Sequence, residues 1–331
     1  MHGTWWTAGI AAAAAGGAVW QRRCERREAH AHHRPGHMVR VGDASLHVVA
    51  EGEGQPTVVI ASGIGGSHLE WEQVAAGLRQ VARVVRYDRP GFAFSPYVRG
   101  DRRPEAVATV LREVLAAERI PPPYLLLGHS LGALHVRAYA ALFPQEVAGA
   151  VLVDPAHEDI GELAWARPVG RVAGWAFRVA ALLGPVGMAR VFGRMLTRAD
   201  ARRVADARAP HTAAFLQAAG ALTHRTVGGW RGLAAEYAGL VDTHIRVGDL
   251  ATARGFPAVP VTVISAGLQP PNRFERVGWT LLRTELHRRI AALGPYGRHV
   301  VAEHSGHMVP LDEPEIVVDE VRAMHQRLRM K

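Results

Sequence analysis

Tyr124-Leu-Leu-Leu-Gly-His-Ser130-Leu-Gly-Ala133 is the stretch that decides the fold of this 331-residue chain. Its apolar start predicts a short buried strand, and the apolar run 131–142 predicts a helix directly after it. Between them, Gly128-His-Ser-Leu-Gly132 has the Gly-x-Ser-x-Gly pattern of a tight strand-to-helix turn. A Cβ atom on either glycine would strike the neighbouring backbone. We therefore expect Ser130 in a strained conformation, with its hydroxyl exposed at a helix N-terminus that favours negative charge.

Composition excludes several classes of protein. The single cysteine, Cys24, rules out an intramolecular disulfide framework and a cysteine-based zinc cluster. The formal net charge of +9 would suit an anionic partner, and Lys331 is the only lysine beside many arginines. These arginines are spread along the whole chain, and no basic block is interleaved with aromatic residues as in a nucleic-acid surface. We expect no nucleic-acid partner.

The N-terminal segment is uncharged and Ala-rich over residues 4–20, with Trp5, Trp6 and Trp20 at its two ends. As a helix it would be about 25 Å long, slightly less than the roughly 30 Å of a hydrocarbon core. The tryptophans fit the membrane interfaces, and the arginines at 22–27 would mark the cytoplasmic side. The segment therefore predicts a membrane tether for a cytoplasmic domain. An unstructured leader is the alternative, and the basic and histidine-rich stretch that follows, up to residue 37, is expected to be a solvated linker.

From Met38 onward, short apolar runs alternate with amphipathic stretches. The predicted strands are 39–41, 46–50, 57–61, 83–87, 125–127, 148–153, 259–264 and 299–302. The predicted helices are 69–78, 104–118, 131–142, 278–293 and 314–329. Buried strands that alternate with helices predict a mostly parallel central sheet with helices on both faces.

This alternation stops between Pro155 and Pro257, where helical patterns dominate, such as 164–183, 186–196 and 212–222. We interpret the stretch as a helical lid inserted after the strand that ends at Asp154. The predicted domains are an N-terminal segment and linker (1–37), a core (38–157 and 258–331) and the lid (158–257).

Four motifs give the chain a resemblance to a known family. They are Ser62-Gly-Ile-Gly-Gly66, Tyr87-Asp-Arg-Pro-Gly-Phe92 with Ser95, Gly128-His-Ser-Leu-Gly132, and Ser305-Gly-His307. From about Met38 to its end the chain resembles the α/β-hydrolase superfamily, in the lidded, esterase-like branch with a serine nucleophile. The resemblance implies the α/β-hydrolase fold, with Gly128, His129 and Gly132 as the nucleophile elbow around Ser130. It also implies an oxyanion hole made by the backbone N–H groups of Ile64 and Leu131. Ser62 stands where relatives often have histidine.

A serine hydroxyl needs an adjacent base before it becomes a good nucleophile. Of the 18 histidines, His307 is our candidate, because it follows a predicted strand in a Ser-Gly-His loop; His304 is the alternative. The sequence indicates the carboxylate that would orient His307 less clearly. Many relatives in the superfamily place an aspartate in the loop after the strand that corresponds to 259–264, and this loop has none here. The other place that the superfamily uses is the end of the strand after the nucleophile helix, so the resemblance implies Asp154 at the end of the strand 148–153. Glu275 is the alternative acid, and a turn-forming aspartate is the structural alternative for Asp154.

These residues predict a serine-dependent hydrolase that forms an acyl-enzyme on Ser130. The apolar lid favours a carboxylic ester of a hydrophobic small molecule, and no metal or cofactor is implied. A serine in the elbow argues against the epoxide hydrolases and dehalogenases of the superfamily, which use a carboxylate. Two alternatives stay open: an acyltransferase with the same triad, and a membrane-tethered binding or signalling protein without turnover. We expect Asp88 to hold its own turn and Arg89 to pair with it or to face an acidic surface.

Overall fold

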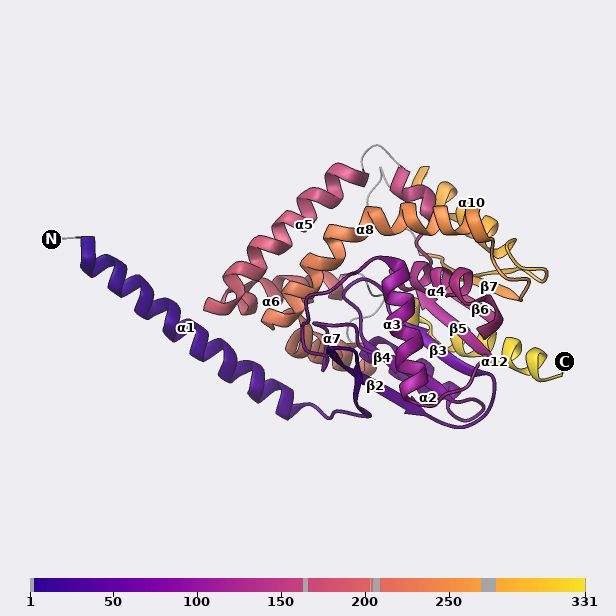
Figure 1. Ribbon diagram of the computed structural model, residues 1–331, viewed down its shortest axis with the longest axis horizontal. Coiled ribbons are helices and arrows are strands. Elements are labelled where there is room, and N and C mark those ends of the chain that lie inside the picture. The colour runs from indigo at the N-terminus through magenta and orange to yellow at the C-terminus, as the bar shows by residue number, and fades with distance from the viewer. Residues whose placement is uncertain (1–2, 163–165, 203, 205–208, 269–277, 331) are drawn as a thin grey trace.

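The computed structural model describes residues 3–162, 166–202, 204, 209–268 and 278–330. An eight-stranded sheet lies at its centre, with the strand order β1-β2-β4-β3-β5-β6-β7-β8 (Figure 1). The first two pairings are antiparallel and the other five are parallel. The strands are β1 (His37–Val41), β2 (Ala44–Glu51), β3 (Thr57–Ala61), β4 (Val84–Tyr87), β5 (Tyr124–His129), β6 (Val147–Val153), β7 (Val261–Ala266) and β8 (Arg298–Ala302). The predicted mostly parallel sheet is confirmed.

Helices cover both faces of this sheet. One core cluster joins it to α3 (Pro104–Ala117), α4 (Leu131–Leu142) and α10 (Gly278–Ala291). The other joins it to α2 (Glu72–Leu78), α11 (Val309–Asp312) and α12 (Pro314–Arg329). The continuous apolar run of β5 serves both, because successive side chains of a strand point to opposite faces: Leu126 belongs to the first cluster, Leu125 and Leu127 to the second.

In its described part, the chain between β6 and β7 forms helices and no strand. They are η3 (Glu158–Glu162), α5 (Ala166–Leu183), η4 (Gly184–Val186), α6 (Met188–Ala201), α7 (Pro210–Ala219), η5 (Gly220–His224) and α8 (Val227–Arg254). This helical segment has a small core of its own, in which Phe177 of α5 stacks on Tyr237 of α8. The sequence pattern did not delimit α8, because glycines interrupt it. Two of these glycines allow close packing: a Cβ at Gly232 would lie 2.9 Å from Phe92, and one at Gly229 1.9 Å from Thr223 O.

The N-terminus forms one long helix, α1 (Gly3–Ala31), which runs through the arginines that were expected in a linker. The linker prediction was wrong up to Ala31, because this half of α1 packs on the helical segment. Gln21 donates to Arg225 O at 2.7 Å, and Glu25 accepts from Val227 N at 2.7 Å. The other half projects away from the body (Figure 1).

Candidate active site

Ser130 lies at the turn between β5 and α4, with φ 52° and ψ −118°. This conformation is uncommon for a residue with a side chain and signals local strain. The two glycines of the motif permit it. A Cβ at Gly132 would lie 2.1 Å from Ala61 O, and one at Gly128 would lie 2.8 Å from Ala133 Cα. The absence of a side chain at these two positions therefore permits the tight turn, and the hydrogen bond from Ser130 N to Val153 O, at 3.1 Å, helps to hold it.

His307 lies in the loop between β8 and α11, and its ring reaches Ser130 and Asp154 together. Its Nε2 is 3.1 Å from Ser130 Oγ, and its Nδ1 is 2.7 Å from Asp154 Oδ2. With Nδ1 donating to the carboxylate, Nε2 is free to accept the serine proton. The side chain of His307 is 44% exposed and that of Asp154 is 2% exposed. Water can thus reach the His307 ring, while the Asp154 carboxylate stays buried.

Asp154 follows β6, and its side chain faces the neighbouring strand instead of closing its own turn. Oδ1 accepts from the backbone N–H of Ala266 at 3.0 Å, and Arg283 Nη1 lies 3.4 Å from Oδ2. Burial alone would raise the pKa of Asp154, but the hydrogen bond and charge of His307, helped by Arg283, hold it well below its ordinary value. The carboxyl is therefore ionised near neutral pH.

The two alternatives are placed differently. His304 is exposed, and its backbone N–H donates to Glu313 at 2.8 Å. Glu275, the alternative acid, lies outside the described residues.

The predicted donor loop, residues 62–66, follows β3 and lies against the elbow. A Cβ at Gly63 would be 3.4 Å from Ser130 Cβ, so this loop passes directly beside the nucleophile candidate. Ile64 belongs to the loop, and Leu131 is the first residue of α4. Ser62, where relatives often have histidine, accepts from Trp71 Nε1 and donates to Ser67 O, both at 3.0 Å. Its side chain holds the loop.

A buried ion pair that the sequence did not indicate supports the same loop. Arg89 donates to Ser62 O at 2.8 Å and to Gly63 O at 2.5 Å, and its Nε donates to Glu236 at 2.6 Å. Glu236, on α8, also accepts from Gly65 N at 2.9 Å. Burial alone would lower the pKa of Arg89, but Glu236 raises it. The pair ties α8 to the loop that passes Ser130.

Both alternatives expected for Arg89 were therefore wrong: Arg89 is buried away from the surface, and it does not pair with Asp88, because Asp88 is engaged elsewhere. Asp88 is fully buried and accepts from the Nδ1 atoms of His47 and His68, at 2.8 and 2.9 Å. Among the described residues these three form the one group of side chains that could hold a metal ion. Their hydrogen bonds to one another already account for the cluster, which fixes the turn after β4 to β2 and η1 (His68–Trp71).

His129, the second residue of the elbow motif, supports the histidine loop. Its Nε2 lies 2.8 Å from His307 O, and the two rings are 4.8 Å apart. Its Nδ1 is 3.9 Å from Glu70, which also accepts from Gly63 N at 3.2 Å. Burial alone would lower the pKa of His129, but Glu70 raises it. Sequence reasoning had assigned Glu70 no role, since nothing local marks it.

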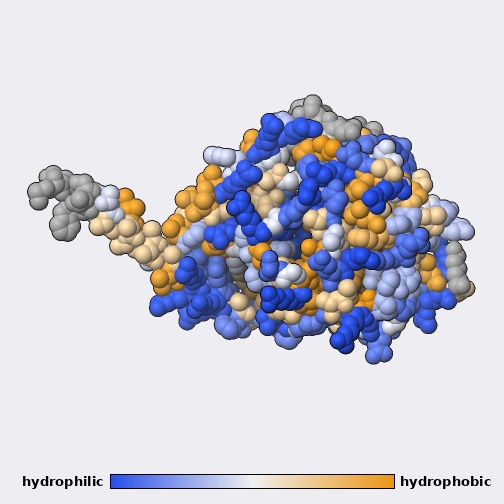
Figure 2. Space-filling model, viewed as in Figure 1, coloured by the Kyte–Doolittle hydropathy of each residue, from blue (hydrophilic) through white to orange (hydrophobic). Residues whose placement is uncertain are grey.

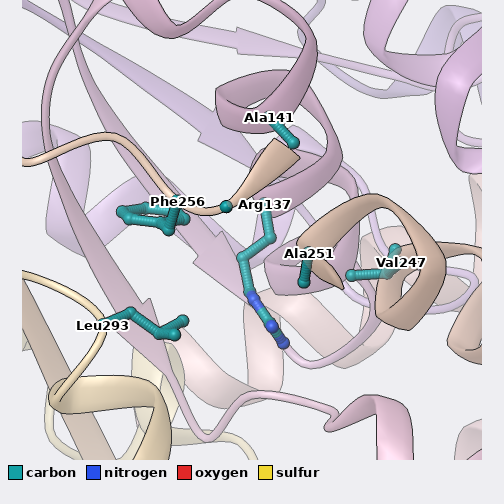
Figure 3. A pocket seen from close by; sticks show the side chains of 7 residues that line it. Arg137, Ala141, Val247, Ala251, Phe256 and Leu293 are labelled. Atoms are coloured by element: carbon teal, nitrogen blue, oxygen red, sulfur yellow. The ribbon is translucent and has the colours of Figure 1, made fainter. Parts of the chain in front are cut away.

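A separate hollow is lined by none of the residues described so far (Figure 3). It is lined by Arg137 and Ala141 of α4, Val247 and Ala251 of α8, and Gly255, Phe256 and Leu293. Its one charged group, Arg137, is already bound to Glu158 through two hydrogen bonds of 2.5 and 2.7 Å. The hollow therefore offers no chemistry of its own.

Comparisons with known proteins agree with this architecture. YqjL, an uncharacterized protein of Bacillus subtilis, is 31% identical over 109 residues, which are 33% of this chain and 43% of YqjL. The match thus spans less than half of that curated relative. A thermophilic esterase from Thermogutta terrifontis superposes with a TM-score of 0.66 at 20% identity, over 88% of this chain and 97% of the esterase. The epoxide hydrolase CorEH gives 0.65 at 18% identity, over 88% and 98%. At such identities the superpositions show a shared fold.

A family model described as the alpha/beta hydrolase fold matches residues 56–266, which is more than half of the sequence and includes Ser130, Asp154 and the donor loop. The chain belongs to the α/β-hydrolase family.

Proposed function

We propose that this protein is a serine hydrolase that cleaves carboxylic esters of hydrophobic small molecules. The observation that carries the proposal is the hydrogen-bonded series Ser130 Oγ, His307 and Asp154, with distances of 3.1 and 2.7 Å. A nucleophile, a base and an orienting acid in this order are the arrangement that acyl transfer to serine requires.

In the proposed reaction, Ser130 Oγ attacks the ester carbonyl while His307 Nε2 takes the hydroxyl proton. The ionised Asp154 holds the Nδ1–H tautomer and stabilises the imidazolium that forms. His307 then gives its proton to the leaving alcohol, and an acyl-enzyme remains on Ser130. Water, activated by the same histidine, attacks this ester and releases the acid. The exposure of His307 supports hydrolysis, because water reaches the base.

The oxyanion of each tetrahedral intermediate would accept from the backbone N–H groups of Ile64 and Leu131. Donors of this kind stabilise charge only when they are held rigidly. The buried Arg89–Glu236 pair and Glu70 bind the carbonyl and N–H groups of residues 62, 63 and 65, which are the neighbours of Ile64. This support is our argument for a preorganised hole.

The substrate class is inferred from the apolar groups beside the site. Leu233 of α8 lies over the donor loop, with its Cδ2 2.8 Å from the Cβ position of Gly65. The charged groups next to it, Arg89 and Glu236, neutralise each other. An uncharged acyl group fits such surroundings best.

Labelling with a fluorophosphonate probe tests the proposal. We expect the native protein to be labelled at Ser130, Ser130→Ala to remain unlabelled, and aryl esters of increasing acyl length to define the preferred chain. As a control, Ser95→Ala removes a buried hydroxyl that binds Asp88 O and leaves Ser130 in place. Absence of labelling in the native protein would favour the non-catalytic alternative and refute the enzyme.

A further inference from the structure

The surface of the helical segment next to α1 combines exposed apolar side chains with arginines. On α5, Val169, Val172, Trp175 and Leu182 are exposed, Trp175 at 67% and Leu182 at 79%. Their spacings of three and seven residues put them on one side of the helix. Val186, Val191 and Met195 continue the exposed apolar surface into η4 and α6. Contiguous apolar patches of this kind mark interaction sites.

The opposite side of α5 is held by the protein. Phe177 packs on Trp230 and stacks on Tyr237 of α8. By length and composition, Arg167–Val186 is the one helix in the described part of the chain that could cross a membrane, and 28% of it is buried inside the structure. Because one side is committed to α8, a position in the plane of a membrane surface fits this helix better than a crossing.

The part of α1 that projects from the body also exposes apolar side chains. Trp6 is 76% exposed, and of residues 6–16 all but Ala14 are exposed. Contact with the body begins at Gly17, whose Cβ position lies 2.5 Å from Val186 O. In Figure 2 the projecting rod is cream to orange, and orange side chains continue onto the body beside it. The exposed apolar surfaces of α1 and α5 therefore adjoin at η4.

The length of the projecting part of α1 determines which residues would lie at the headgroups if it entered a membrane. Residues 3–16 extend about 21 Å, against about 15 Å for half of a hydrocarbon core. Insertion of this stretch into one leaflet would bring the junction of α1 with η4 to the headgroups. There Trp20, 52% exposed and beneath the Arg190 guanidinium, would meet the interface, where tryptophan is favoured.

The charge of this surface indicates which lipids it fits. Together α5 and α6 carry six arginines and one carboxylate; five of the arginines are exposed, and the sixth, Arg190, pairs with Glu28 of α1. Arg22, Arg23, Arg26 and Arg27 of α1 are exposed close by. Arginines beside exposed Trp and Leu are the composition of helices that bind anionic bilayers, where each basic residue contributes about 1 kcal/mol.

We propose that α1 and the exposed side of α5 and α6 form one docking surface for an anionic phospholipid bilayer, with α1 in one leaflet and α5 lying along the interface. This surface is defined by Trp6, Ile10, Trp20, Val169, Val172, Trp175, Leu182, Val186, Val191 and Met195. The helix α8 then separates the bilayer from the donor loop, since it binds α5 through Tyr237 and the loop through Glu236.

Flotation of the full chain with vesicles tests the proposal, without any substrate and so independently of the proposed hydrolysis. We expect binding to vesicles of phosphatidylcholine with 30% phosphatidylglycerol to exceed binding to pure phosphatidylcholine by about tenfold or more, and to weaken in high salt. Trp175→Ser with Leu182→Ser should lower the partition coefficient at least tenfold while α1 is intact. The matched control, Val81→Ser with Val301→Ser, removes two exposed apolar residues elsewhere and should bind as wild type.

Three results would overturn the proposal. One is equal flotation of wild type and of the variant with Trp175→Ser and Leu182→Ser (the lid double variant), because α1 alone would then account for the binding. Another is no flotation of wild type with either vesicle. The third is a concentration-dependent dimer that the lid double variant converts to monomer, which would assign this surface to a second copy of the chain. Circular dichroism of each variant establishes that it is folded.

Discussion

Two residues of the candidate site have a strained backbone conformation that their surroundings hold in place. Ser130 has φ 52° and Asp154 has φ 36°, so both candidate site residues that follow strands of the sheet have a strained backbone. Strain of about 1–3 kcal/mol per residue persists only where the surroundings hold it. Here the surroundings are the close contacts of Gly128 and Gly132 and the hydrogen bonds from Ala266 to Asp154 and from Asp154 to Ile264.

Asp154→Asn tests the acid. Asparagine keeps the shape but cannot stabilise the imidazolium or fix the tautomer, so we expect kcat to fall by about 10⁴ with an unchanged fold. Steady-state kinetics on an aryl ester measures this. Asp159→Asn changes a partly exposed aspartate five residues later and should keep wild-type turnover. If Glu275→Gln lost activity while Asp154→Asn kept it, the acid would be Glu275.

Among the elements, α8 connects the helical segment to the edge of the sheet that carries the candidate site. It packs on α5 through aromatic rings and reaches the donor loop through Glu236, which is 5% exposed. A buried carboxylate is tolerated only when it is paired, and Arg89 with Gly65 N supplies its partners. A shift of α8 would therefore disturb the backbone that flanks Ile64.

Glu236→Gln tests this connection. The variant leaves the guanidinium of Arg89 buried without its counter-charge, so we expect a loss of about 3 kcal/mol in the free energy of unfolding. We expect kcat to fall more than KM rises, because the donors act mainly in the transition state. Urea denaturation and kinetics measure the two effects.

The same helix provides the control for this variant. Asp242, 55% exposed, pairs with Arg246 on α8, and Asp242→Asn should cost about 0.5 kcal/mol or less. Equal effects of the two substitutions would refute a special role for Glu236.

At the scale of the whole molecule, the buried titratable groups make acid destabilising. Burial lowers the pKa of His287 to about 4, so the folded protein keeps this ring neutral. Its ordinary value is about 6.5, so stability present above pH 6.5 is lost as the pH falls toward 4. The lowered pKa values of Asp88 and Asp154 continue the trend, since stability present above pH ~4 is lost below it.

We therefore expect the free energy of unfolding to decrease by on the order of 2 kcal/mol from His287 alone between pH 7 and pH 4.5. Urea denaturation at pH 8, 6 and 4.5 measures it. His287→Asn should reduce the slope of the curve between pH 6.5 and 4.5, and the lowered pKa values of the buried His135 and His244 should maintain the remaining slope. Stability that stayed constant over this range in the wild type would contradict the prediction.

The elbow and the sheet could be predicted from the sequence, because the residues that determine each turn, strand and helix are neighbours in the chain. Glycines on both sides of Ser130 and an apolar run before it leave one conformation for the turn, and 57–61, 131–142 and 314–329 have the bounds of β3, α4 and α12. His307 and Asp154 could be selected because each follows a predicted strand, and parallel strands end at one edge of the sheet. Their roles in catalysis stay predictions.

The sequence by itself thus determined the family fold, the strained serine and the two partners that lie beside it. Only the tertiary structure decided that Arg89 binds Glu236, 147 positions away, that Asp88 binds two histidines, and that α1 continues onto the helical segment. The physical reason is that a buried charge takes its partner from whichever segment packing brings next to it. That choice depends on the arrangement of α8 and η1 around the sheet, which no local pattern encodes.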